Sequence, residues 1–254
     1  MRKSTKPKNS IIYSGPSLID GSPIVCIAIV SSGNTKTGNM VQTHILRADI
    51  NPLEASKTGL DYAICGNCKH RGKPTEDATK KQAIERSCYV NLGQGPNVVF
   101  KAFKRGVYPI VTDSETIKTL GHGRMVRLGT YGDPSAIPSS VWDALLADSI
   151  GHTGYSHQHD INKPEIYTRA MYSADSPSDA IQAHSKGYRT FRVIPVNEWQ
   201  TKGNASLLNN EILCPASIEA GRKAQCIDCK LCAGNKTKAK SIAIVAHGAT
   251  RNKA

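Results

Sequence analysis

The chain alternates between short apolar runs, which predict β-strands, and spaced apolar faces, which predict amphipathic helices. Strands are expected where aliphatic and β-branched residues cluster between turn residues, at 22–30, 41–50, 124–130, 152–156, 188–194 and 241–246. Helices are expected where apolar residues recur at helical spacing, at 96–105, 139–150 and 178–186. Gly106 is suited to end the first of these helices, and Ser139 and Ser176 are suited to cap the other two.

From residue 124 onward the predicted strands and helices alternate. This order is typical of βαβ units, so the sequence predicts an α/β protein whose βα repeats form a parallel sheet or an incomplete barrel, with 241–246 as the closing strand. Ligands of such folds bind at the carboxyl ends of the strands. Segment 31–39 lacks the Gly-Lys-Ser/Thr ending of a phosphate loop, which favours a hairpin loop between the first two strands.

Residues 1–10 show no hydrophobic periodicity and are expected to form a disordered basic arm. Residues 11–254 are expected to form one α/β domain with cysteine-rich insertions at 61–92 and 211–240. The first insertion has few large apolar residues, so something other than a hydrophobic core has to order it. The sequence therefore predicts cysteine-rich metal-binding loops attached to the sheet.

The composition and the apolar runs of the chain are those of a globular protein without a membrane-spanning segment. Hydrophobic residues make up 39% and charged residues 21% of the 254 positions, close to globular averages. No apolar run approaches the roughly 20 residues that span a bilayer. Polar residues follow the basic start, where a secretory signal would have an apolar region. We therefore expect a cytoplasmic protein with no membrane partner.

The formal net charge is +13, and the basic residues are clustered. Residues 1–9 hold four basic and no acidic side chains, residues 66–108 hold nine and three, and residues 221–254 hold eight and one. Such clusters suit a polyanion such as nucleic acid, although lysines that only keep a protein in solution give the same pattern. The candidate phosphate contacts are Lys69, Arg71, Lys73, Lys101, Lys104, Arg105, Arg222, Lys223 and Lys230.

Four cysteines near the C-terminus are the strongest chemical signal. Cys226, Cys229 and Cys232 follow one another with two-residue spacers, and Cys214 lies upstream with eleven residues between it and Cys226. Four thiolates can hold a 4Fe–4S cluster or Zn²⁺, and the short triple repeat suits the cluster somewhat better because zinc sites usually pair two Cys-x2-Cys hairpins. Unligated thiols are the remaining interpretation.

A second group contains Cys65, Cys68 and Cys88, with His70 as an ambiguous fourth ligand. Three cysteines and one histidine fit a closed structural zinc site, which carries no chemistry. The two cysteine groups could also meet and share one centre. Cys26 lies alone in an apolar run and is expected to be a core residue.

The pair His157 and His159, followed by Tyr167 and Tyr172, suggests a rolling-circle type of endonuclease, which holds a divalent metal with two histidines and attacks DNA with tyrosine. The polar Gln158 between the histidines departs from that pattern. A pair of exposed histidines at the end of a strand is the simpler interpretation.

Several polar residues lie in or near the ends of apolar runs, where burial without a partner is costly. A pocket for a nucleotide or a single strand is their expected location, because tyrosines there could stack on a base. The candidate pocket residues are Arg127, Tyr131, Asp133, Tyr155, His157, Arg169 and Arg192.

These motifs together resemble a family of phage- and plasmid-encoded proteins of undefined function. The resemblance rests on the Cys-x2-Cys loop, on residues 86–91, 126–134 and 154–158, and on the C-terminal cysteine run, and it spans most of residues 11–247. Such proteins are distantly similar to radical-SAM enzymes in having cysteine motifs beside a βα sheet, but this chain lacks a Cys-x3-Cys-x2-Cys run. The resemblance implies a phage or mobile-element origin, hence the host cytoplasm, and no particular activity.

Two main functions are expected from the sequence. The first is a metal-stabilised protein that binds nucleic acid, plausibly single-stranded DNA, in replication or transcription. The second is an iron–sulfur enzyme that acts on nucleotides or nucleic acid. The rolling-circle endonuclease is a further alternative, and a host replication or transcription protein is a candidate partner.

Overall fold

The computed structural model describes residues 7–31, 37–159, 164–221, 224–236 and 238–253. The strands in this part of the chain are β1 (Ser10–Pro16), β2 (Pro23–Ile29), β3 (Val41–Arg47), β4 (Met125–Tyr131), β5 (Gly151–Thr153), β6 (Tyr155–Ser156), β7 (Met171–Ala174), β8 (Thr190–Ile194), β9 (Glu211–Leu213) and β10 (Ser241–Val245). The α-helices are α1 (Pro52–Thr58), α2 (Tyr62–Cys65), α3 (Gly95–Lys104), α4 (Ser114–Gly121), α5 (Ser139–Leu146), α6 (Pro177–Ser185), α7 (Val196–Lys202) and α8 (Cys226–Cys229).

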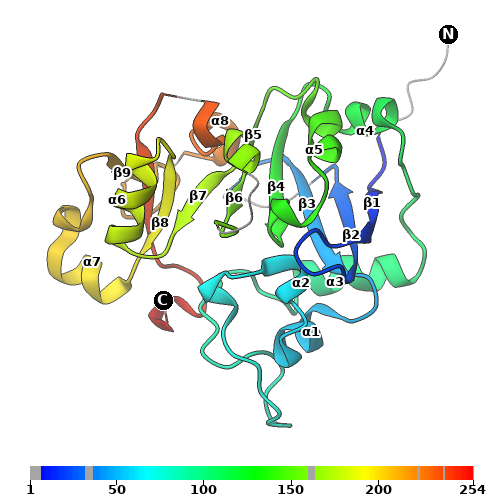
Figure 1. Cartoon of the computed structure of the whole chain (residues 1–254), viewed down its shortest axis with the longest axis horizontal. Helices are drawn as coiled ribbons and strands as arrows, with labels where there is room; N and C mark the ends of the chain where they lie inside the picture. The colour runs from blue at the N-terminus through cyan, green and yellow to red at the C-terminus, as the bar shows by residue number, and fades with distance from the viewer. Residues whose placement is uncertain (1–6, 32–36, 160–163, 222–223, 237, 254) are drawn as a thin grey trace.

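The strands form two five-stranded sheets (Figure 1). The first sheet has the order β1-β2-β3-β4-β5 and is mixed, because β1, β2 and β3 pair antiparallel whereas β3, β4 and β5 pair parallel. The second sheet has the order β6-β7-β8-β10-β9 and is parallel throughout. The expected α/β fold class is therefore confirmed.

The two sheets meet at Gly154, the single residue between β5 and β6. Its N–H donates to the carbonyl of Cys232 at 3.0 Å, and its carbonyl accepts from the N–H of Met171 at 2.8 Å. A Cβ atom at this position would lie 3.2 Å from Cβ of Leu128, which is a tight contact. A glycine thus lets one strand pass from the first sheet to the second while it anchors a cysteine-bearing loop.

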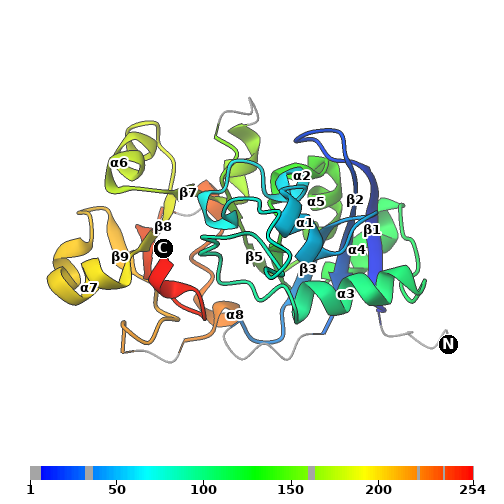
Figure 2. The same cartoon turned by 90° about the horizontal axis from the view of Figure 1, so that it is seen from below.

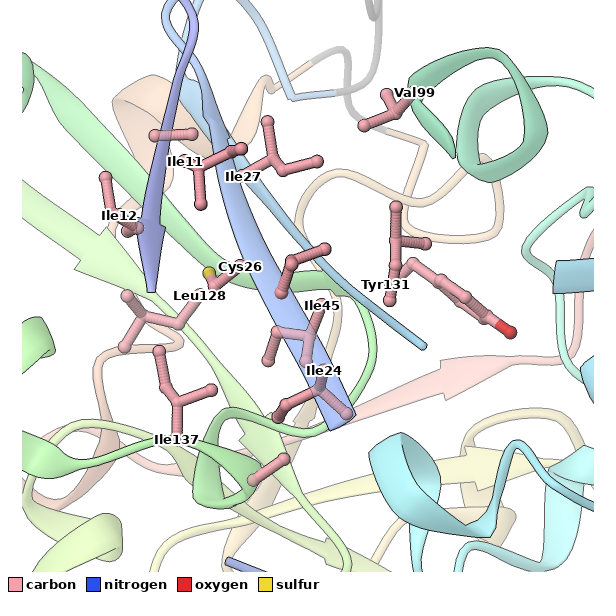
Figure 3. Close-up of a cluster of buried hydrophobic side chains, with 14 of the residues drawn as sticks. Ile11, Ile12, Ile24, Cys26, Ile27, Ile45, Val99, Leu128, Tyr131 and Ile137 are labelled. Carbon is pink, nitrogen blue, oxygen red and sulfur yellow. The ribbon is translucent and has the colours of Figure 1, made fainter. Parts of the chain in front are cut away.

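The main hydrophobic core belongs to the first sheet. Figure 3 shows Ile24, Ile45, Leu128 and Ile137 directed into it, and these side chains are no more than 2% exposed. Cys26 is fully buried in the same core, as expected from its apolar run. This core gives the first sheet a stable platform without any help from a ligand.

The second sheet is covered differently on its two faces. Parallel sheets are normally buried on both faces by helices. Here α6 packs on β7 and β8, and α6 and α7 lie at the end of the molecule away from the first sheet (Figure 1 and Figure 2). The apolar cluster of this sheet is small, and two of its five buried members are Cys214 and Cys232. The other face of the second sheet, which we call its inner face, is therefore covered by cysteine-bearing segments.

Several element predictions are confirmed, and others differ for identifiable reasons. Ser176 caps α6 by accepting from the N–H of Asp179, as expected. Helix α5 ends at Leu146 instead of residue 150, and its N-cap is Pro138, so the expected serine cap is wrong. Strand β10 lies between β8 and β9, so it does not close a barrel.

The first described residues are ordered, which moves the predicted domain boundary. Ser10 is buried and begins β1, and the side-chain carbonyl of Asn9 accepts from the N–H of Val30 at 2.9 Å. Residues 1–6 of the expected arm lie outside the described residues. Within the part of the chain that the structure describes, no helix has the length and apolar character needed to cross a membrane.

Candidate metal centre

A cavity of about 450 Å³ lies on the inner face of the second sheet. Alternate residues of its strands point into the cavity, so that Tyr155, Phe191, Val193, Ile242 and Ile244 form an apolar wall. The volume falls within the range of about 300–1,000 Å³ that is usual for small-molecule and cofactor sites. Much of the remaining lining comes from the two cysteine groups, which the sequence places far apart, and other segments add residues such as His44, Gln94 and Arg127.

All four C-terminal cysteines line this cavity. Cys214 directly follows β9, and α8 carries Cys226 and Cys229 in a single turn. Lys230 adopts the left-handed conformation with φ 56° at the end of α8 and turns the chain toward Cys232. Local backbone geometry therefore gathers these thiols, and none of the eight cysteines, which all lie in the described ranges, forms a disulfide.

The Cys232 thiol is held in a protonated state when no metal is bound. Burial, together with the neighbouring Cys214, Cys226 and Cys229, raises its pKa to about 12, although a hydrogen bond from the Tyr155 hydroxyl acts in the opposite direction. The sulfurs of this group are close enough to affect one another's charge. A positively charged group among them would favour their thiolate forms.

Arg127 is a buried cation on the wall of the same cavity. Its guanidinium donates to the Tyr89 hydroxyl and lies 5.5 Å from the ring centre of Tyr155. Burial alone would lower its pKa, but Tyr89, Tyr155, Cys226 and Cys232 raise it above the usual range. Among the described residues no carboxylate forms an ion pair with Arg127, so its charge faces tyrosines and thiols.

The first cysteine group contributes Cys68, His70 and Cys88 to the cavity. Cys65 does not line it; burial raises the pKa of its thiol well above the usual value, and Asp61, Cys68 and Cys88 raise it further. The two groups therefore share one cavity. Metal binding by the eight predicted ligands stays a prediction.

Two residues beyond the predicted ligand set meet His70. His157 follows β6 and Asp175 follows β7, and one ligand atom from each of the three side chains lies within 4.8 Å of the others. His157 was expected as a pocket residue, whereas Asp175 was missed because β7 has only four residues and no strand was predicted there. An acidic residue just before the helix signal Ser176-Pro177 was the available clue.

The electrostatics of these residues differ sharply. Burial, together with the charges of His157 and Lys69, lowers the pKa of His70 to about 4. Burial would also lower the pKa of His157, but Cys68 and Asp175 raise it well above its ordinary value. The two imidazoles are therefore shifted in opposite directions, with the neutral form favoured at His70 and the protonated form favoured at His157 by Cys68 and Asp175.

The predicted pocket residues separate into two sets. Arg127, Tyr155 and His157 line the cavity. The other four do not: Tyr131 is buried in the main core, and Asp133 accepts from the N–H of His157 at 2.8 Å. Arg169 pairs with Asp143, and Arg192 pairs with Glu211 at 2.6 Å. Both arginines therefore have a carboxylate partner within the chain, Arg192 in the interior and Arg169 at the surface, and neither needs a ligand to balance its charge.

His159 is not placed to share a metal ion with His157. Its Nδ1 lies 2.7 Å from the Tyr167 hydroxyl and its Nε2 lies 3.0 Å from the carbonyl of Ser173, so both ring nitrogens are engaged. Its ring also stacks on Tyr172 with 3.6 Å between ring centres. This packing does not favour the rolling-circle arrangement of two histidine ligands beside a free tyrosine.

The predicted phosphate contacts have different surroundings. Arg71 links its own segment to the preceding loop, since it donates to Asp61 at 2.6 Å and to the carbonyl of Gly59 at 2.7 Å. Lys69 donates to the carbonyl of Asp175 at 2.6 Å, and Lys73 pairs with Glu85 at 2.7 Å. Exposed cations remain on α3 and just after it, at Lys101, Lys104 and Arg105. Lys230 lines the cavity, and Arg222 and Lys223 lie outside the described residues.

The C-terminal residues hold the first cysteine segment in place. His247 stacks on Tyr89 with 5.1 Å between ring centres, and the Thr250 hydroxyl donates to the carbonyl of Cys88 at 3.1 Å. Figure 2 shows the C-terminal residues beside this segment. We refer to residues 247–250 as the C-terminal strap.

Protonation of His44 should make the free energy of unfolding depend on pH. Burial lowers its pKa to about 4, and Arg127 adds to this effect, so the unfolded chain binds the proton more readily. The free energy of unfolding contributed by this residue should therefore fall by about 2 kcal/mol between pH 7 and pH 5. Urea unfolding of wild type and His44→Gln at both pH values measures it. The exposed His122→Gln serves as control, and equal pH dependence in wild type and His44→Gln would contradict the assignment.

Comparison with known proteins finds no matching family model, no matching curated protein and no matching solved structure. The functional argument therefore depends on the geometry of the cavity.

Proposed function

We propose that the protein is an iron–sulfur enzyme that acts on nucleotides or nucleic acid. In this proposal Cys214, Cys226, Cys229 and Cys232 hold a 4Fe–4S cluster, and the substrate occupies the rest of the cavity. The observation that carries the proposal is that these four thiols and the buried guanidinium of Arg127 line one cavity, with Cys226 and Cys232 close enough to Arg127 to raise its pKa.

The charge of Arg127 favours an anionic group at this position. A buried cation without a carboxylate partner is costly, whereas a cluster held by four thiolates has net negative charge and would compensate it. The N–H of Gly154 and the Tyr155 hydroxyl hold the backbone and the thiol of Cys232, which fixes one ligand in advance. Outer contacts of this kind orient metal ligands and tune the metal.

The four sulfurs, as they lie in the structure, do not have the close spacing that one zinc ion requires. Sulfurs on one zinc ion, at about 2.3 Å each, lie roughly 4 Å apart in a tetrahedron. Among the described residues, only His70, His157 and Asp175 bring three ligand atoms within 4.8 Å of one another, so no three of these sulfurs are that close. A cluster is several atoms wide and holds its cysteines farther apart.

The cavity and α3 support a nucleotide or nucleic acid as substrate. Tyr155 and Phe191, with ring centres 4.4 Å apart, offer aromatic surface to a base. Gln94, Gly95 and Pro96 at the start of α3 line the cavity, whereas Lys101, Lys104 and Arg105 lie exposed at its other end. A polyanion bound along α3, about 15 Å long, would therefore reach the cavity.

Each group has a defined part in this proposal. A bound cluster would supply electrons at the cavity wall. Arg127 would bind negative charge, and the apolar wall would exclude water. The thiol chemistry requires a reducing compartment, which agrees with the expected cytoplasmic location, the host cytoplasm if the chain is phage-encoded.

The exposed cations of α3 also favour a second candidate, a metal-stabilised nucleic-acid-binding protein without catalysis. The two candidates share the binding surface and differ in the metal. Anaerobic purification followed by iron, sulfide and zinc analysis separates them. The enzyme proposal expects a brown protein with about four irons and four sulfides per chain. A colourless protein with stoichiometric zinc and no sulfide would exclude it.

Nucleic-acid binding is tested by fluorescence anisotropy with a labelled single-stranded oligonucleotide over a range of salt concentrations. Binding should weaken steeply with salt, and Lys101→Gln with Lys104→Gln should reduce the log–log slope by about 1.4, which corresponds to two lost phosphate contacts. The matched control removes two lysines from the outer helices, as Lys186→Gln with Lys202→Gln. Equal effects of both pairs, or no binding at low salt, would contradict the predicted surface.

A further inference from the structure

A second group of possible metal ligands, His70, His157 and Asp175, lies at the cavity and is not used by the proposed cluster. His70 comes from the short 3-10 helix Lys69–Arg71, His157 from the end of β6 and Asp175 from the end of β7. Because β6 and β7 are adjacent parallel strands, their carboxyl ends place His157 and Asp175 at one edge of the sheet. The first cysteine segment then brings His70 against them, with the His70 and His157 ring centres 5.9 Å apart.

The spacing of the ligand atoms suits one small cation. The three atoms lie within 4.8 Å of one another, and His157 Nε2 is 3.3 Å from Asp175 Oδ1. Nitrogen and oxygen atoms bound to one ion at about 2.1 Å lie roughly 3–3.5 Å apart, so this pair already has the spacing of two ligands. Asp175 Oδ1 is buried and accepts no hydrogen bond of regular geometry among the described residues.

Hydrogen bonds from residues outside the ligand set orient His70, His157 and Asp175. Ser87 Oγ lies 2.7 Å from His70 Nδ1, which leaves Nε2 of that ring for a metal. Asp133 accepts from the backbone N–H of His157, and Lys69 holds the carbonyl of Asp175. Hydrogen bonds to the second ring nitrogen of a ligating histidine are the usual support of such sites.

We propose that His70, His157 and Asp175 bind one divalent transition-metal ion of the Zn²⁺ or Fe²⁺ class, with its remaining coordination positions open to the cavity. Two histidines and one carboxylate are the ligand set of catalytic zinc sites and of non-haem iron sites. His70 and His157 line the cavity, so water or an oxygen atom of a substrate can reach the ion there. The ion would act as a Lewis acid on that ligand. This site is separate from the four C-terminal cysteines and does not depend on the cluster.

The test is a titration of the full-length, chelator-treated protein with Co²⁺, followed by visible absorption. It is made in wild type and in the double variant Cys226→Ser, Cys229→Ser, so that loss of the cluster and loss of this site can be told apart. We expect one Co²⁺ with nitrogen and oxygen ligands in the double variant. The near-isosteric Asp175→Asn should weaken that binding at least about 100-fold. The exposed His122→Gln is the matched control and should bind as wild type does.

Two outcomes would overturn the proposal. One is Co²⁺ binding by Asp175→Asn with the wild-type affinity. The other is a thiolate spectrum that Asp175→Asn leaves unchanged, as expected if Cys65, Cys68 and Cys88 bind the ion together. Circular dichroism checks that each variant is folded. Zinc X-ray absorption on the Cys226→Ser, Cys229→Ser protein gives a second measurement, in which imidazole scattering supports the site and an all-sulfur shell contradicts it.

Discussion

Serine at both Cys226 and Cys229 is expected to remove essentially all bound iron and sulfide from the anaerobically prepared protein. In the proposed cluster these two cysteines are the ligands that α8 places in one turn, and a serine hydroxyl at neutral pH does not replace a thiolate toward iron. Both side chains are only partly buried, so the substitution itself should cost little packing. Iron and sulfide analysis, with the visible spectrum, measures the loss.

Cys26→Ala is the matched control for this prediction. Cys26 is fully buried in the main core, so its truncation should lower the free energy of unfolding by about 1 kcal/mol and leave the iron content unchanged. If the double serine variant retains the wild-type content of iron and sulfide, the assignment of the cluster to the C-terminal cysteines is wrong.

Glu211→Gln is expected to lower the free energy of unfolding by about 3–5 kcal/mol, because it leaves the charge of Arg192 buried without a counter-ion. Arg192 Nε and Nη2 donate to the two carboxylate oxygens of Glu211 at 2.9 and 2.6 Å. The two side chains are 1% and 0% exposed. Urea unfolding followed by circular dichroism measures the change.

The exposed pair Lys73 and Glu85 provides the comparison, since these side chains are 70% and 62% exposed at a similar separation of 2.7 Å. Glu85→Gln should change the free energy of unfolding by less than about 1 kcal/mol. Equal losses in the two variants would show that burial does not determine the strength of the Arg192 pair.

The sequence predicted the parts of this molecule that short-range patterns determine. Cysteine spacing marked both cysteine groups, and periodicity marked α3 and most strands of the two sheets. Asp175 was not found, because the four residues of β7 are too few for a recognisable pattern. The position of β10 between β8 and β9 was also missed, since strand order depends on long-range packing that periodicity does not record.

Arg127 and Arg192 also show that long-range packing cannot be predicted from short-range patterns. Arg127 and Arg192 are both buried arginines in strands, and the sequence places both in a pocket. The structure separates them by their partners: Glu211 neutralises Arg192, whereas Arg127 faces tyrosines and thiols. Glu211 is nineteen residues from Arg192 along the chain, so only the folded structure shows which arginine is available to a ligand.

The C-terminal strap has a practical consequence for preparing the protein. Ala246 and His247 line the cavity, and Thr250 bonds to the segment that carries Cys88. A polyhistidine tag fused after Ala254 would therefore place chelating groups a few residues from both candidate metal sites and compete for their ions. Purification by a tag at the other terminus would avoid this competition when the metal content of the protein is measured.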